Sequence, residues 1–210
     1  APWTHLHVLP TGDIFPCCMS AHEPANAVGN CHQGDSLETA WNSGAMRALR
    51  LRMLADEGST LCERCYRGEA VGQDTWRTSQ NRQMAHHFPV VRRTRADGGL
   101  DELNLPYLDI RFSNVCNLRC RICAPHLSSR WHGDAVSLEW LSPDAPAILR
   151  ATADPEELWR QIAPLVPGLE RFHFAGGEPL VMEEHYRLLQ MLLDHGSRDV
   201  RLSYNTNLST

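Results

Sequence analysis

The fold and the chemistry of this protein are decided by residues 116–123, which read CNLRCRIC. This stretch carries three thiols at CX3CX2C spacing, those of Cys116, Cys120 and Cys123, directly after a strand candidate at residues 108–113. Thiolates are soft ligands that select iron–sulfur clusters or zinc. Three of them on a 4Fe–4S cluster leave one iron without a protein ligand. A structural zinc site would instead need a fourth ligand, for which His126 and His132 are candidates.

The spacing of the cysteines also indicates the cellular compartment of the protein. The 210 residues contain eight cysteines, mostly in adjacent, i+3 and i+4 pairs, which suit metal binding better than long-range disulfides. We find no signal peptide and no apolar run near the roughly 20 residues of a membrane span. We therefore expect a cytoplasmic protein without a membrane partner. A net charge of −5 gives no general affinity for nucleic acid.

Beyond the cysteine stretch, strands alternate with helices. Asp154 is an N-cap followed by proline, and residues 171–174 form a second predicted strand. Apolar residues over 186–193 mark an amphipathic helix that Gly196 ends, and residues 200–204 form a third strand. This alternation predicts parallel βαβ units of the α/β class, whose chemistry gathers beyond the carboxyl ends of the strands.

Two polar motifs follow the later strands. The second strand ends in Gly176, Gly177, Glu178 and Pro179, and the third ends in Asn205, Thr206 and Asn207. Either motif alone is an ordinary turn signal. In this order, behind a CX3CX2C motif, they resemble the signatures of the radical S-adenosylmethionine (SAM) enzymes. The resemblance predicts that residues 106–210 hold the first three of the six βα units of a partial (β/α) barrel.

The family resemblance implies a site for each cofactor. Cys116, Cys120 and Cys123 would hold a 4Fe–4S cluster whose open iron binds SAM. Residues 176–179 would hold the methionine amino group, Asn205 and Asn207 would lie near the ribose, and the backbone of Ile122 would meet the adenine. The sequence departs from the family at Ile122, where an aromatic residue is common, and at Leu208, where glycine is usual.

The same resemblance implies a reaction. An electron, supplied by a donor such as flavodoxin or ferredoxin, cleaves SAM to a 5′-deoxyadenosyl radical that abstracts a substrate hydrogen. We expect a peptide or protein substrate. The alternatives are a sugar, nucleotide or other small metabolite, or a non-catalytic iron–sulfur or zinc protein that acts as a scaffold or sensor.

The first 76 residues contain a second group of cysteines. A strand over residues 3–8 and a helix over 36–55 are expected here, with Gly12 to Cys17 at GX4C spacing and Cys62 to Cys65 at CX2C spacing. Together these motifs resemble the SPASM/Twitch domains, which implies an auxiliary iron–sulfur cluster on Cys17, Cys62 and Cys65. Zinc is the alternative for the same thiolates.

The fourth ligand of this auxiliary site is left open. Cys18 and Cys31 are local candidates, although a free cysteine is more often a small buried hydrophobe. In the resembled pattern a cysteine commonly lies ten or more residues before the glycine, at or beyond the start of this chain. An open iron that binds substrate is the third possibility.

Three segments are thus predicted. A small cysteine-rich α+β auxiliary-cluster domain (1–76) precedes a basic connector (77–105) and the first half of the barrel (106–210). The connector is either a solvated linker or a phosphate- or carboxylate-binding surface on Arg92, Arg93 and Arg95. Because three βα units leave an open sheet edge, we expect the chain to be part of a longer product or to be completed by another polypeptide.

Overall fold

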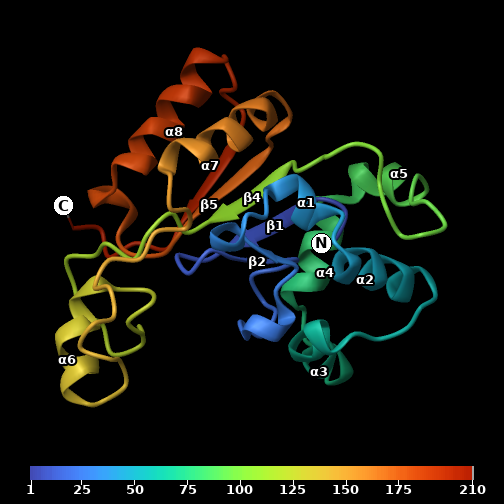
Figure 1. Ribbon diagram of the computed structural model, residues 1–210. Coiled ribbons are helices and arrows are strands. Elements are labelled where there is room, and N and C mark those ends of the chain that lie inside the picture. The colour runs from blue at the N-terminus through green and yellow to red at the C-terminus, as the bar shows by residue number, and fades with distance from the viewer. Residues whose placement is uncertain (210) are drawn as a thin grey trace.

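The computed structural model describes residues 1–209. Its centre is one mixed six-stranded sheet with the order β3-β2-β1-β4-β5-β6 (Figure 1). The strands are β1 (His5–Val8), β2 (Asp13–Phe15), β3 (Gly29–Asn30), β4 (Tyr107–Ile110), β5 (Arg171–Phe174) and β6 (Arg201–Tyr204). Strands β1, β4, β5 and β6 are parallel, whereas β2 and β3 pair antiparallel beside β1.

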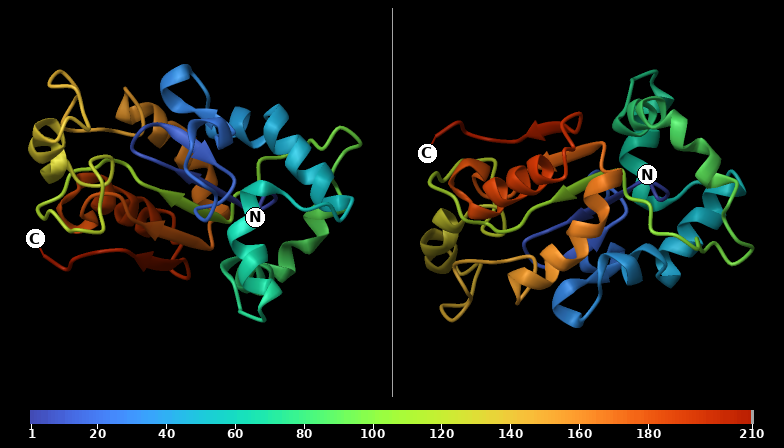
Figure 2. Two further views of the ribbon diagram at one scale, coloured as in Figure 1. Left: turned by 90° about the horizontal axis from the view of Figure 1, so that it is seen from below. Right: turned by 90° about the horizontal axis from the view of Figure 1, so that it is seen from above.

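The helices lie around this sheet. They are α1 (Leu37–Trp41), α2 (Gly44–Leu54), α3 (Glu63–Ala70), α4 (Trp76–Gln83), α5 (Phe88–Val91), α6 (His132–Ser137), α7 (Pro155–Ile162) and α8 (Glu183–Asp194). Figure 2 shows the teal segment with α3 and the yellow segment with α6 on opposite sides of the sheet. Among residues 1–209, no helix has both the length and the apolar character needed to cross a membrane.

One face of the sheet is apolar because side chains alternate between the two faces of a strand. Leu108 and Ile110 of β4 and Phe172 and Phe174 of β5 are at most 1% exposed and belong to one hydrophobic core. That core also contains buried side chains of α1, α2, α7 and α8, among them Trp41, Met46, Ile162 and Leu188. Burial of this face holds the parallel strands and their helices together.

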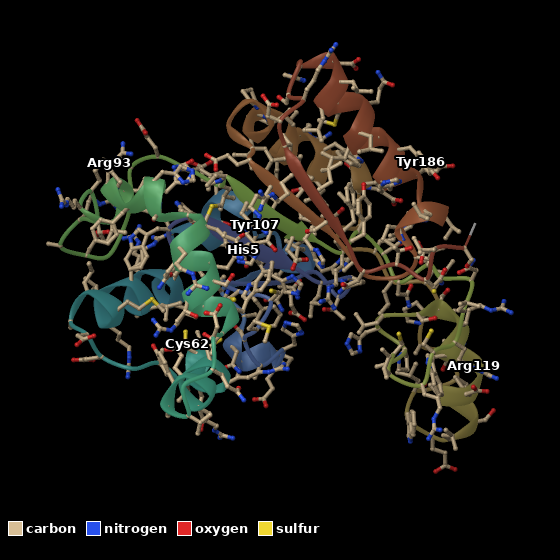
Figure 3. The ribbon with its side chains drawn as sticks, turned by 180° about the vertical axis from the view of Figure 1, so that it is seen from behind. His5, Cys62, Arg93, Tyr107, Arg119 and Tyr186 are labelled. Carbon is tan, nitrogen blue, oxygen red and sulfur yellow. The ribbon has the colours of Figure 1, made fainter. Side chains whose placement is uncertain are left out.

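The other face carries polar side chains. The His7 Nδ1 and Asp109 Oδ1 atoms lie 3.1 Å apart, and the two side chains are 0% and 1% exposed. Beside them the rings of His5 and Tyr107 stack with centroids 4.2 Å apart (Figure 3). Burial alone would raise the pKa of Asp109, but the adjacent His7 outweighs it and leaves the pKa well below its ordinary value. The carboxylate is therefore held charged inside the protein.

Most of the predicted elements are present. The strand at 171–174 and the capped helix after Asp154 are confirmed, and the strand predicted at 200–204 begins one residue later. The helix predicted over 36–55 is divided into α1 and α2. The division arises because the Ser43 hydroxyl accepts a hydrogen bond from Met46 N and starts a new helix.

The connector folds as helices α4 and α5, and two of the three arginines of the predicted anion-binding surface have acidic partners, whereas Arg92 lies over the Phe88 ring. Arg95 pairs with Asp97 and Asp101, and Arg93 lies 3.8 Å from Glu102. These two arginines of the predicted anion-binding surface are therefore neutralised within the chain.

Strand β1 of the first predicted segment pairs in parallel with β4 of the third, from His5 beside Tyr107 to Val8 beside Ile110. One sheet thus crosses the boundaries predicted at residues 76 and 105. The α/β class is confirmed. In residues 1–209 the strands form an open mixed sheet, so the partial barrel and the division into three domains stay predictions.

Replacing Asp109 by alanine should lower the free energy of unfolding by about 3–5 kcal/mol, because it leaves His7 buried without its partner. Asp74→Ala is the matched control, since it removes an exposed ion pair with Arg82 and should cost at most about 1 kcal/mol. Urea unfolding measures both. Equal losses in the two variants would contradict a structural role for the buried pair.

Candidate metal and cofactor sites

Three loops meet beyond the carboxyl ends of β4, β5 and β6. The backbone N–H of Gly177 donates to the Ser113 carbonyl at 3.0 Å, and that of Glu178 donates to the Val115 carbonyl at 2.8 Å. These bonds join the loop after β5 to the start of the cysteine stretch. Parallel strands end at the same edge of a sheet, so the motifs that follow them are brought together.

Glycine is required where these loops touch. A Cβ atom on Gly177 would lie 1.7 Å from the Val115 carbonyl oxygen, which is backbone and has no room to move aside. Gly176 has φ +112°, a conformation that side chains other than glycine rarely adopt. The pair of glycines therefore lets the second loop pack directly on the chain leading to Cys116.

The Glu178 side chain joins the second loop to the third. It is 1% exposed. Its carboxylate accepts hydrogen bonds from the Leu180 N–H at 3.0 Å, the Thr206 hydroxyl at 2.5 Å and the Asn207 N–H at 2.7 Å. Asn207 in turn donates from Nδ2 to Asn117 Oδ1 at 3.0 Å, inside the cysteine stretch. The three predicted motifs thus form one hydrogen-bonded unit.

The structure refines the expected role of Glu178. Because both carboxylate oxygens have partners within the protein, this residue positions the loops. Of the four residues of the turn, Gly176 and Gly177 are partly exposed, whereas Glu178 and Pro179 are buried. Asn205 continues the strand ladder by donating from its N–H to the Phe174 carbonyl at 2.9 Å. Ile122 projects from the cysteine stretch with its side chain 95% exposed, which leaves space beside it.

The cysteine stretch is supported by residues that the sequence did not single out. Asn114 is 1% exposed, and its Nδ2 donates to the carbonyls of Pro125 and Ala147 at 2.9 and 3.0 Å. Its Oδ1 accepts from Leu149 N at 2.8 Å. A buried asparagine with every bond satisfied fixes the course of a long loop. The position of this asparagine, two residues before the first cysteine, was the sequence feature that could have indicated its supporting role.

A second support comes from residues 128–131, which follow the cysteine stretch along the chain. The Trp131 indole donates to the Cys120 carbonyl at 2.9 Å, and the Ser129 hydroxyl accepts from Cys116 N at 3.3 Å. Both contacts fix the backbone of a predicted ligand. They hold the loop in shape from the side away from β5.

The three thiols of the stretch lie within electrostatic reach of one another. Burial raises the pKa of Cys123, and the charges of Cys120 and Cys116 raise it further. All three side chains are half-buried, as ligands of an accessible metal centre must be. His132 lies apart, because its Nε2 is engaged 2.8 Å from the Ala145 carbonyl oxygen.

The second cysteine group lies at the other edge of the sheet. Figure 3 places Cys62 and Arg119, which is part of the cysteine stretch, on opposite sides of the molecule. Burial raises the pKa of Cys62, and the charges of Cys17 and Cys65 add to it. The amino group of Ala1 is buried beside Cys17 and Cys62, and burial lowers its pKa. Cys17, Cys62 and Cys65 therefore lie in one region of the structure, and their role as ligands of one cluster stays a prediction.

The two remaining cysteines behave differently. Cys18 donates a hydrogen bond to Cys17, which lowers the pKa of the Cys17 thiol well below its ordinary value. Cys31 instead packs against the core, and its pKa is raised to about 11 by burial and by the charges of Glu157 and Asp35. Cys18 therefore adjoins the auxiliary group, whereas Cys31 does not.

Gly177→Ala should lower the free energy of unfolding by about 1–3 kcal/mol, because the new methyl group overlaps the Val115 carbonyl. Gly133→Ala in α6 is the control, since a Cβ there meets no atom within 4 Å. Thermal unfolding compares the two. A Gly177→Ala protein as stable as Gly133→Ala would show that the loops do not pack this closely.

Two comparisons with known proteins found similarities, and a third found none. Residues 1–66 match the family model of the SPASM iron–sulfur cluster-binding domain. Over 106 residues the chain is 26% identical to a GTP 3′,8-cyclase of Campylobacter lari, a match that covers 50% of this chain and 28% of the cyclase. No solved structure matches the chain. Residues 1–66 are thus a SPASM iron–sulfur cluster-binding domain, as their cysteine motifs predicted.

Proposed function

We propose that this protein is a radical SAM enzyme with an auxiliary iron–sulfur cluster. The observation that carries the proposal is the meeting of three loops beyond β4, β5 and β6, where the buried Glu178 carboxylate binds the third loop and Gly177 packs on the first. The SPASM match and the partial similarity to GTP 3′,8-cyclase support the proposal.

The spacing of the thiols favours iron–sulfur clusters over zinc. Tetrahedral zinc, with Zn–S bonds of about 2.3 Å, draws its sulfur atoms to within roughly 4 Å of one another. Among residues 1–209, neither cysteine group has three ligand atoms that all lie within 4.8 Å, and neither His126 nor His132 completes such a set. An iron–sulfur cluster binds each thiolate through a different iron and accommodates wider spacing.

The residues of the C-terminal sheet edge fit the two cofactors. Cys116, Cys120 and Cys123 would hold the cluster on a loop fixed by Asn114 and Trp131. The backbone of residues 176–179, the exposed Asn205 and the open space beside Ile122 would receive SAM. When bound, these cofactors supply a carbon-centred radical able to abstract a hydrogen atom. The chain's own part is to position SAM and the substrate over one thiol triad.

We propose a peptide or protein as the substrate. Large apolar side chains stand exposed on and beside the cysteine stretch, namely Leu118 at 44%, Ile122 at 95%, Leu138 at 53% and Trp140 at 63%. Such a surface suits the mixed apolar and polar side chains of a peptide. A nucleotide is the second candidate, favoured by the partial similarity to GTP 3′,8-cyclase.

Cys116→Ala, Cys120→Ala and Cys123→Ala should each abolish reductive SAM cleavage after anaerobic reconstitution and lower the iron content by about four per chain. Cys62→Ala should remove a similar amount of iron at the auxiliary site. Cys31→Ala is the control and should retain both clusters, since Cys31 lies in neither group. Iron and sulfide analysis together with 5′-deoxyadenosine assays check these outcomes. SAM cleavage retained in any of the first three variants would refute the proposal.

The substrate class is tested with the reconstituted protein, a reductant and SAM. A mixed peptide library should accelerate 5′-deoxyadenosine formation, whereas GTP should leave it at the rate without substrate. Acceleration by GTP alone would overturn the peptide assignment in favour of the nucleotide. Changing Trp140 to serine, outside the ligand set, should weaken the peptide response and leave the basal rate unchanged.

A further inference from the structure

Two histidines of the connector converge on one carboxylate. His86 and His87 lie in the short 3-10 turn Ala85–His87, between α4 and α5. Their Nε2 atoms each lie 2.8 Å from Glu170, His86 at Oε2 and His87 at Oε1. The side chain of His86 is 56% exposed, that of His87 is 17% exposed and that of Glu170 is 40% exposed, so the group is open to solvent. Neither cysteine group includes any of these residues.

The backbone of Glu170 is fixed by hydrogen bonds on both sides. The Glu170 N–H donates to the Pro106 carbonyl at 2.9 Å, and its carbonyl accepts from Arg201 N at 2.8 Å. Glu170 thus stands in the sheet at the start of β5, at the opposite edge from the cysteine stretch. These two backbone hydrogen bonds hold the main chain of Glu170 beside β4 and β6.

The helix before the two histidines is also held in place. Thr75 caps the start of α4 with a reciprocal pair of bonds to Thr78. Farther along α4, Gln83 accepts a hydrogen bond from Arg171, the residue after Glu170. The helix that leads into the turn is therefore tied to β5 through Arg171, which also lies 3.5 Å from Gln80 Oε1. Ligands held on rigid elements bind a metal without first paying for their ordering.

The chemistry of the group suits a transition metal. Two imidazoles and one carboxylate form the His2Glu set that binds zinc in open, three-ligand sites, with bonds of about 2.0–2.2 Å. The three ligand atoms all lie within 4.8 Å of one another, and no other group of three in residues 1–209 does so. Beside Glu170 is a hollow of about 560 Å³, lined also by Met84, Arg171 and Arg201, which leaves room for a further ligand.

We propose that His86, His87 and Glu170 bind a divalent transition-metal ion of the zinc class and leave at least one coordination position open toward the hollow. The metal would take the place of the two hydrogen bonds that now join the imidazoles to the carboxylate. It would also join the connector to β5. The site shares no ligand with either cysteine group, and it lies at the opposite end of the sheet from the cysteine stretch.

The test is equilibrium dialysis of the full chain against zinc, with zinc and iron measured on the same samples. Glu170→Gln and the double variant His86→Gln/His87→Gln should each bind one zinc fewer per chain than wild type, or bind it at least about tenfold more weakly. His195→Gln is the matched control, because His195 contacts only the Met191 carbonyl on its own helix. Since the measurement is a difference between variants, zinc held by thiols cancels.

A second readout separates metal binding from a purely structural contact. Zinc should raise the urea midpoint of wild type and of His195→Gln by more than it raises that of Glu170→Gln. Equal zinc content in all variants, or an equal zinc-dependent shift of the midpoint, would overturn the proposal. Loss of SAM cleavage in the cysteine variants, or its absence in wild type, has no bearing on either measurement.

Discussion

One buried carboxylate, that of Glu178, sets the relative positions of the three loops that carry the proposed chemistry. Burying a charge is costly unless hydrogen bonds replace its hydration. Glu178 obtains them from its own loop and from the loop after β6. Only glycine at 176 and 177 allows this loop to lie against the cysteine stretch. The third loop in turn donates a hydrogen bond to Asn117 of the cysteine stretch, so each of the three loops contacts the other two.

The sheet separates the two groups of cysteines, which are held by different contacts. Cys116, Cys120 and Cys123 stand beyond the carboxyl end of β4, on a loop held by side-chain contacts. Cys17 stands at the other end, beside His5 at the start of β1. The two groups are separated by the length of the four-residue strand β4, which spans roughly 10 Å. The polar face between them, with His7 and Asp109 at its centre, is buried rather than hydrated.

Local patterns predicted a large part of this molecule. Strand alternation located β5 and β6, proline and aspartate located α7, and CX3CX2C, GX4C and CX2C located both cysteine groups. Three features escaped prediction because they depend on contacts between distant segments. They are the parallel pairing of β1 with β4, the support of the cysteine stretch by Asn114 and Trp131, and the meeting of His86 and His87 with Glu170. No local spacing records any of these contacts.

The pairing of β1 with β4 has a consequence for how the protein folds. His5 and Tyr107 are neighbours in the sheet although roughly a hundred residues separate them along the chain. Such non-local contacts form slowly, because the chain loses the conformational entropy of the intervening loop before the contact can stabilise it. During synthesis, β1 and β2 therefore emerge as a hairpin without its parallel neighbour. Cys17, which follows β2, therefore lies beside an incomplete sheet until β4 has been synthesised.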